Sequence, residues 1–189
     1  YAMVFKFPDF INKLIVVNGA HPICLQEALI DDKLQAEASQ YFQTLREDDA
    51  GIKTAANDFN FFFEIISGKT NPNWVTEKVK QRFREAWGGA ERLQAMLNWY
   101  KSSPIIVPVV GQRLPEVPLY GVSRDKFKVT VPHLLIWGED DIAFLSSVRK
   151  SIQEFCDNLQ IEKVENADHW ILHTHAELVA NRIRRYLNN

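Results

Sequence analysis

The chain has 189 residues, of which 46% are hydrophobic and 24% charged, and its formal net charge is −2. This length and balance are typical of one globular domain and exclude an intrinsically disordered or low-complexity chain. The small net charge gives no broad basic surface, so we expect neither a nucleic-acid partner nor a membrane partner.

The cysteine content bears on the compartment. Cys24 and Cys156 are too few and too far apart in sequence for a disulfide framework or a zinc site, which favours a reducing compartment. No apolar run approaches the roughly twenty residues needed to span a bilayer, and no signal-peptide pattern opens the chain. We therefore predict a cytoplasmic protein.

The first predicted elements are a helix end and a strand. Residues 1–7 are typical of the end of a core helix, which Pro8 stops. The run Leu14 to Val17 then predicts a strand over residues 12–18 that is buried on both faces. Such a strand at the edge of a small sheet leaves ladder donors and acceptors unpaired. We therefore expect a partner to cover it, either a preceding part of the protein or a second copy in a homodimer.

Residues 23–126 have mostly helical periodicity and many aromatic residues. Apolar positions between Leu25 and Arg46 predict one long or two short helices broken near Asp31, and residues 59–66 predict an aromatic helix. A proline-rich linker leads back toward the sheet. A long helical insertion at the sheet edge where the chemistry lies predicts a lid.

The C-terminal part predicts the centre of the sheet. Leu134 to Trp137 indicates a buried parallel strand over residues 132–137, which ends in a glycine and three acids. A helix over 144–157, a strand over 160–165 and a helix over 174–187 complete a right-handed βαβ unit with a closing helix. Parallel strands flanked by helices predict the α/β fold class, with functional residues at the carboxyl ends of the strands.

An acid and a histidine follow successive strands in this order. The acidic turn after residue 138 comes first, and His169 follows the next strand. This matches the last two members of the order nucleophile, acid, histidine.

Several motifs in sequence order resemble α/β-hydrolases of the epoxide hydrolase and haloalkane dehalogenase type. Residues 14–22 resemble the segment after the nucleophile helix, and residues 136–141 and 167–170 resemble the acid and histidine motifs. Residues 39–43 and 97–101 resemble the two tyrosine segments of the lid, with a lysine where arginine is usual. The resemblance implies a C-terminal part of an α/β-hydrolase fold. Its parts are a core segment 1–22, a helical lid or cap 23–126, and a core segment 127–189 with the acid and the histidine.

The resemblance implies that Asp141 is the acid of a catalytic triad and His169 its base. A buried carboxylate fixes the tautomer of the imidazole and stabilises its cation. Glu139 and Asp140 compete with Asp141 for the role, and like charges so close do not all stay buried and ionised. The other interpretation of this turn is an acidic cap for a helix that begins near Ala143.

Tyr41 and Tyr100 correspond to the two lid tyrosines. By resemblance they donate phenolic protons to the epoxide oxygen as the ring opens. The other interpretation is that both are amphipathic core residues of helices. The remaining aromatics of the chain indicate an apolar pocket wall and therefore a small hydrophobic substrate.

The other histidines do not indicate a metal site. His169 and His173 have helical i, i+4 spacing and His175 lies close by, but no acid or cysteine completes a ligand set. We expect His133 to pack at the end of a strand. The resemblance implies neither a metal nor an organic cofactor.

The chain departs from the family pattern at the nucleophile. It contains no Gly-x-Asp/Ser-x-Gly elbow and no His-Gly-x-Pro oxyanion turn. We therefore interpret it as a fragment of an epoxide hydrolase-like enzyme, inactive alone. Two alternatives stay open: a haloalkane or haloacetate dehalogenase, and a non-catalytic truncated chain that acts as a folded dimer or binding module.

Overall fold

The computed structural model describes residues 1–67, 73–109 and 111–188. In this part of the chain, β1 (Leu14–Val17), β2 (His133–Gly138) and β3 (Leu159–Val164) form one parallel sheet in the order β1-β2-β3. The central strand β2 is buried along its whole length. The α/β class and the three predicted strands are therefore confirmed.

The chain divides into two compact units. The first, here the sheet unit, comprises residues 1–39 and 104–189, and the second, the helical unit, comprises residues 40–103. Residues 23–39 and 104–126, which the sequence assigns to the lid, group with the sheet unit. The lid assignment of 23–126 stays a prediction, and residues 68–72 and 110 of that range lie outside the described residues.

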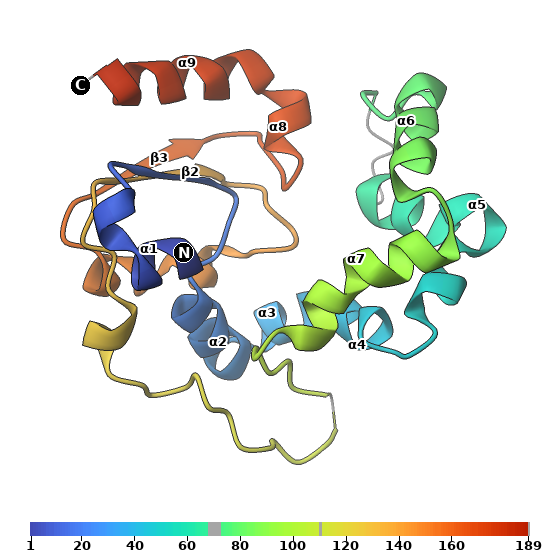
Figure 1. The fold of residues 1–189 in the computed structure, drawn as a ribbon, viewed down its shortest axis with the longest axis horizontal. Coiled ribbons are helices and arrows are strands. Elements are labelled where there is room, and N and C mark those ends of the chain that lie inside the picture. The colour runs from blue at the N-terminus through green and yellow to red at the C-terminus, as the bar shows by residue number, and fades with distance from the viewer. Residues whose placement is uncertain (68–72, 110, 189) are drawn as a thin grey trace. The chain divides into compact units, whose positions relative to one another are not determined.

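The helices of the sheet unit surround the three strands. They are α1 (Ala2–Lys6), α2 (Pro22–Asp31), α3 (Lys33–Ala38), α8 (Ile171–Thr174) and α9 (Ala176–Asn188), with 3-10 helices η1 (Pro8–Phe10), η2 (Arg124–Phe127), η3 (Ser146–Arg149) and η4 (Ile152–Phe155). In Figure 1, α9 lies along one side of the strands and α2 on the opposite side. The predicted break near Asp31 is confirmed, since Asp32 separates α2 from α3 and caps α3 with its side chain.

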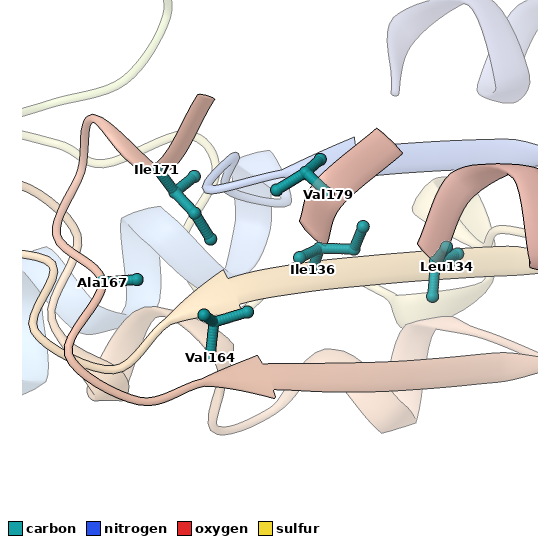
Figure 2. Close-up of a cluster of buried hydrophobic side chains, with 6 residues drawn as sticks. All are labelled: Leu134, Ile136, Val164, Ala167, Ile171 and Val179. Atoms are coloured by element: carbon teal, nitrogen blue, oxygen red, sulfur yellow. The ribbon is translucent and has the colours of Figure 1, made fainter. Parts of the chain in front are cut away.

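Alternation along the strands gives each face its own core. Leu134 and Ile136 of β2 face α8 and α9, where they form a cluster shown in Figure 2: Leu134, Ile136, Val164, Ala167, Ile171 and Val179. A separate cluster of Val4, Val129 and Val131 packs with Leu14. Because the first cluster includes both the loop after β3 and the helix after it, burial of apolar surface fixes where that loop lies.

The helical unit contains α4 (Tyr41–Leu45), α5 (Ala50–Ser67), α6 (Glu77–Trp87) and α7 (Ala90–Ser102). Its aromatic rings gather on Trp87, which lies about 5 Å between centroids from Phe59, Phe62, Phe63 and Phe83. The Thr76 hydroxyl caps the start of α6, and Gly88 in the left-handed region ends it. The predicted aromatic helix over 59–66 is confirmed for the part of α5 that follows Phe59, whereas residues 56–59 have non-helical φ and ψ angles and kink this helix.

The predicted helix over 144–157 is wrong. The structure has the two short 3-10 helices η3 and η4 there. The backbone of this segment forms hydrogen bonds with distant parts of the chain. The N–H of Leu145 donates to the Gln35 side chain, and the carbonyl of Phe155 accepts from the N–H of Val129. These long-range partners outweigh the local helical pattern.

Candidate active site

Asp141 lies in the turn after β2, at the carboxyl edge of the sheet, and is only 4% exposed to solvent. Its Oδ1 accepts hydrogen bonds from the backbone N–H groups of Ala143 and Phe144, each 2.8 Å long. Its Oδ2 lies 2.8 Å from Nδ1 of His169. One carboxylate therefore caps the following turn and binds the imidazole at the same time. The helix that the alternative interpretation expected to begin near Ala143 is not there, since the next helical element is η3, which begins at Ser146.

His169 is carried by the loop between β3 and α8, and its side chain is 27% exposed. Because Nδ1 faces a carboxylate oxygen, Nδ1 carries the proton and donates it. In the neutral form of this imidazole Nε2 has the lone pair, and it makes no hydrogen bond within the described chain. The rings of Phe144 and Trp170 meet the imidazole edge to face, at 5.5 and 5.4 Å between centroids. This is the arrangement of a general base with its orienting acid.

The two competing acids lie in other environments. Glu139 forms ion pairs with Arg149 at 2.6 Å and with Lys163 at 3.6 Å. Asp140 is exposed, and its backbone N–H donates to the carbonyl of Ala167. The structure thus brings Asp141, and neither neighbour, to His169.

Gly138 permits the close approach of the acid strand to the histidine loop. A Cβ atom at Gly138 would lie 2.9 Å from the carbonyl oxygen of Asp168 and would also overlap the carbonyl group of Ala167. These obstacles are backbone atoms, which yield only if the loop moves. The acid and the histidine can face each other because this residue has no side chain.

Gly138→Ala is expected to destabilise the chain by about 1–3 kcal/mol. We also expect it to move the loop that carries His169 away from the turn that carries Asp141. Urea unfolding gives the first effect, and backbone chemical shifts of residues 165–170 give the second. Gly19→Ala is the comparison variant, because within 3 Å its Cβ would meet one side-chain atom, Cγ1 of Val16, and no backbone atom. Equal, small effects of both substitutions would contradict the steric role of Gly138.

Gln35 of α3, which no sequence pattern indicates as a site residue, is fully buried beside the acid turn. Its Nε2 donates to the carbonyl of Ala143 at 2.9 Å, and its Oε1 accepts from the N–H of Leu145 at 2.8 Å. A glutamine within a helix gives no sequence signal of such a role, because most glutamines are exposed.

Tyr41 on α4 and Tyr100 on α7 lie near each other within the helical unit, with ring centroids 6.5 Å apart. Both rings also contact Phe42, at 4.8 and 4.9 Å. Burial raises the pKa of the Tyr100 hydroxyl, so this phenol is protonated at neutral pH. The neighbouring Lys101 pairs with Asp48. Their predicted role as proton donors remains a prediction.

The cysteines lack the features of catalytic thiolates. Burial raises the pKa of Cys24 to about 12 and that of Cys156 to about 11, which keeps both as thiols at neutral pH. Neither cysteine forms a disulfide. His133 is fully buried at the start of β2, as predicted.

In residues 1–67, 73–109 and 111–188, no group of three or more His, Cys, Asp or Glu is placed to hold a metal ion. No helix among the described residues is long and apolar enough to cross a membrane.

The sheet unit has a cavity of about 490 Å³, which does not border Asp141 or His169. Charged residues line much of it: Glu27, Asp31, Asp32, Arg124, Lys150 and Glu154. It does not match the apolar substrate cavity that the sequence indicates, and that cavity remains a prediction.

Comparisons with known proteins point to hydrolases with an α/β fold. No protein-family model matches the chain. The AB hydrolase superfamily protein YfhM of Bacillus subtilis is 29% identical over 185 residues, which cover 96% of this chain and 59% of that protein. Epoxide hydrolase 3 of Xenopus tropicalis is 26% identical over 192 residues, which cover 95% and 47%. The crystal structure of Bacillus megaterium epoxide hydrolase with an inhibitor has a TM-score of 0.81 at 22% identity, over 98% of this chain and 64% of that one.

The chain is therefore similar in sequence to proteins of the α/β-hydrolase superfamily, and its parallel sheet, with the acid and the histidine at the carboxyl edge, has the fold of part of such a protein. The similar proteins include epoxide hydrolases, so the likeness is epoxide hydrolase-like, and the strands and helices of the chain form part of that fold. The chain spans between 47% and 64% of the length of the relatives described above.

Proposed function

We propose that this chain supplies the acid and the base of an epoxide hydrolase-like reaction on a small hydrophobic substrate. The observation that carries the proposal is the 2.8 Å contact between Asp141 Oδ2 and His169 Nδ1, which leaves Nε2 with its lone pair. A base held in this tautomer can remove a proton from water.

The proposed reaction has two steps. A carboxylate nucleophile attacks an epoxide carbon, the carbon–oxygen bond of the ring breaks, and the alkoxide takes a proton from Tyr41 or Tyr100. His169 then removes a proton from water, and the hydroxide attacks the carbonyl carbon of the ester. The tetrahedral intermediate breaks its bond to the alkoxide, which takes the proton from His169 and leaves as the diol. The carboxylic acid formed in this step returns its proton to the tyrosinate, so the carboxylate, the tyrosine and the neutral imidazole are all restored. Asp141 stabilises the imidazolium while the proton is on His169.

The nucleophile is proposed to come from sequence other than these residues, because the 189 residues contain no Gly-x-Asp/Ser-x-Gly elbow. Within the described chain, β1 pairs with β2 alone and leaves its other edge unpaired. We propose that the segment carrying the nucleophile, or a second copy of the chain, covers that edge. A cytoplasmic location, inferred from the cysteine content, belongs to the same proposal.

A dehalogenase is the second candidate function, since it uses the same ester chemistry. The proximity of Tyr41 and Tyr100 in the helical unit favours an epoxide, because two phenols suit a developing alkoxide better than a halide. A non-catalytic binding module is the third candidate, and the missing elbow motif favours it.

One assay separates the three functions. The 189-residue chain and a protein that also contains the nucleophile segment are each incubated with styrene oxide and with a chloroalkane, and diol and chloride are quantified. We expect diol from the longer protein, no product from the chain alone, and loss of diol on His169→Ala. Chloride release instead of diol would indicate the dehalogenase, and no product from either would indicate the binding module. Turnover by the pure chain, lost on His169→Ala, would show that it contains its own nucleophile.

A further inference from the structure

Asn18 joins the two segments that carry the acid and the histidine. It follows β1, is 6% exposed and has a positive φ of 44°. Its Oδ1 accepts the N–H of Gly138 at 2.8 Å, and its Nδ2 donates to the carbonyl of Asp168 at 2.8 Å. Its own N–H donates to the carbonyl of Ile136 at 3.0 Å. One buried amide thus binds both the end of β2 and the loop after β3.

These two contacts adjoin the candidate site. Gly138 begins the turn that leads to Asp141, and Asp168 directly precedes His169. A change in the spacing between these backbone groups therefore changes the contact between Oδ2 and Nδ1. The geometry of reacting groups is sensitive to such changes, and a displacement of 1 Å costs on the order of 100-fold in rate.

The side chain of asparagine meets the requirements of this position. It offers one donor and one acceptor on a short stem, and asparagine tolerates the left-handed region better than most residues. An aspartate keeps the acceptor for Gly138 but places an oxygen against the carbonyl oxygen of Asp168. A glycine keeps the backbone conformation and loses both contacts.

We propose that Asn18 is a positioning residue that sets the contact between His169 and Asp141. The inference rests on the proposed function for its catalytic meaning, whereas the geometric effect is measurable without turnover. The readout is the Nδ1–H signal of His169 in ¹H–¹⁵N spectra of the imidazole, which reports both the tautomer and the hydrogen bond to the carboxylate.

The variant Asn18→Gly is compared with Gln26→Ala. Gln26 is also a fully buried amide with two backbone bonds, both to Ile106, at 2.9 and 2.7 Å. Both variants lose two buried side-chain hydrogen bonds, and we expect similar losses of stability. We expect the Nδ1–H signal to be lost in Asn18→Gly and retained in Gln26→Ala. Retention of the signal in Asn18→Gly, with its wild-type exchange rate, would overturn the proposal.

Asn18→Asp covers the case in which the glycine variant fails to fold. It keeps the bond to Gly138 and loses only the donation to Asp168, so we expect Nδ1–H exchange about tenfold faster than in the wild type. An unchanged exchange rate here also overturns the proposal. In the protein with the nucleophile segment, we expect Asn18→Gly to lower kcat by about 10- to 100-fold with KM unchanged. An altered imidazole signal in a protein that releases no diol would uphold the positioning role and reject the hydrolase function.

Discussion

Replacing Asp141 with asparagine, in a protein that contains the nucleophile segment, is expected to slow hydrolysis of the alkyl-enzyme ester by about 10⁴-fold. That magnitude is typical of an isosteric change at the acid of a hydrolase triad. Formation of the ester does not use His169 as a base, so the first step is expected to continue.

The expected loss follows from the two oxygens of the carboxylate. An asparagine keeps one oxygen to accept the N–H groups of Ala143 and Phe144. Its NH₂ group then occupies the place of Oδ2 and faces Nδ1 of His169, where two donors meet. The imidazole relieves this by moving its proton to Nε2, and the nitrogen that should accept the water proton no longer has a lone pair. The variant therefore has the wrong tautomer in an otherwise intact fold.

Mass spectrometry of the acid-quenched protein measures the result directly. We expect the ester to accumulate to about one equivalent in Asp141→Asn and in His169→Ala, and to stay low in the wild type. Asp140→Asn is the matched control, since Asp140 is exposed and contributes a backbone contact. Steady-state turnover of Asp141→Asn within a few-fold of the wild type would contradict the role assigned to this acid.

The sequence predicts the sheet well because its strands are defined by composition. The four apolar residues of β1 and the apolar run of β2 have the pattern of parallel strands covered on both faces, and the structure places strands there. β2 is buried along its whole length as predicted, whereas the residues of β1 are only half-buried. The end of β2 also predicts an acidic turn at the carboxyl edge, where the structure places Asp141. Local apolar patterns and the order of elements suffice for this level of description.

Contacts between distant segments account for what the sequence does not predict. The apolar pattern of 144–157 is typical of a helix. The N–H of Leu145, however, donates a hydrogen bond to the side chain of Gln35, which lies more than a hundred residues earlier in the chain. Asn18 after β1 reads as a turn residue, and nothing near it in sequence indicates its bonds to Gly138 and Asp168. A buried amide gains its role from the backbone groups that the fold brings to it, and a single sequence does not contain them.

The second large effect is expected at two buried histidines away from the candidate site. His21 and His133 are both fully buried, and their rings lie 5.1 and 5.5 Å from the ring of Tyr1. Burial lowers the pKa of each from 6.5 to about 4, and repulsion from His21 contributes for His133. The bond from His21 to the carbonyl of Phe127 acts in the opposite direction. Both imidazoles are therefore neutral in the folded chain at neutral pH.

The direction of the pH effect follows from proton binding. Between pH 6.5 and about 4 an unfolded histidine binds a proton that the folded one does not, so lowering the pH favours unfolding. The contribution of each neutral, buried histidine to the stability of the folded chain is fully present above pH 6.5. It decreases as the pH falls below 6.5 and is lost at about pH 4. A depression of this size corresponds to roughly 3 kcal/mol for each histidine. Two such groups amount to a large share of the stability of a small domain.

Urea unfolding at pH 7, 6, 5 and 4 measures this dependence as the slope of unfolding free energy against pH. We expect the slope to decrease by about one proton in His133→Gln, because glutamine stays neutral over the range. The absolute stability of the variant also changes, since His133 contacts Cys156 and Tyr1, so the slope and not the midpoint tests the prediction. His173→Gln replaces an exposed histidine and is expected to leave the slope unchanged. If His133→Gln and His173→Gln have the same slope as the wild type, the buried ring of His133 is not the source of acid sensitivity.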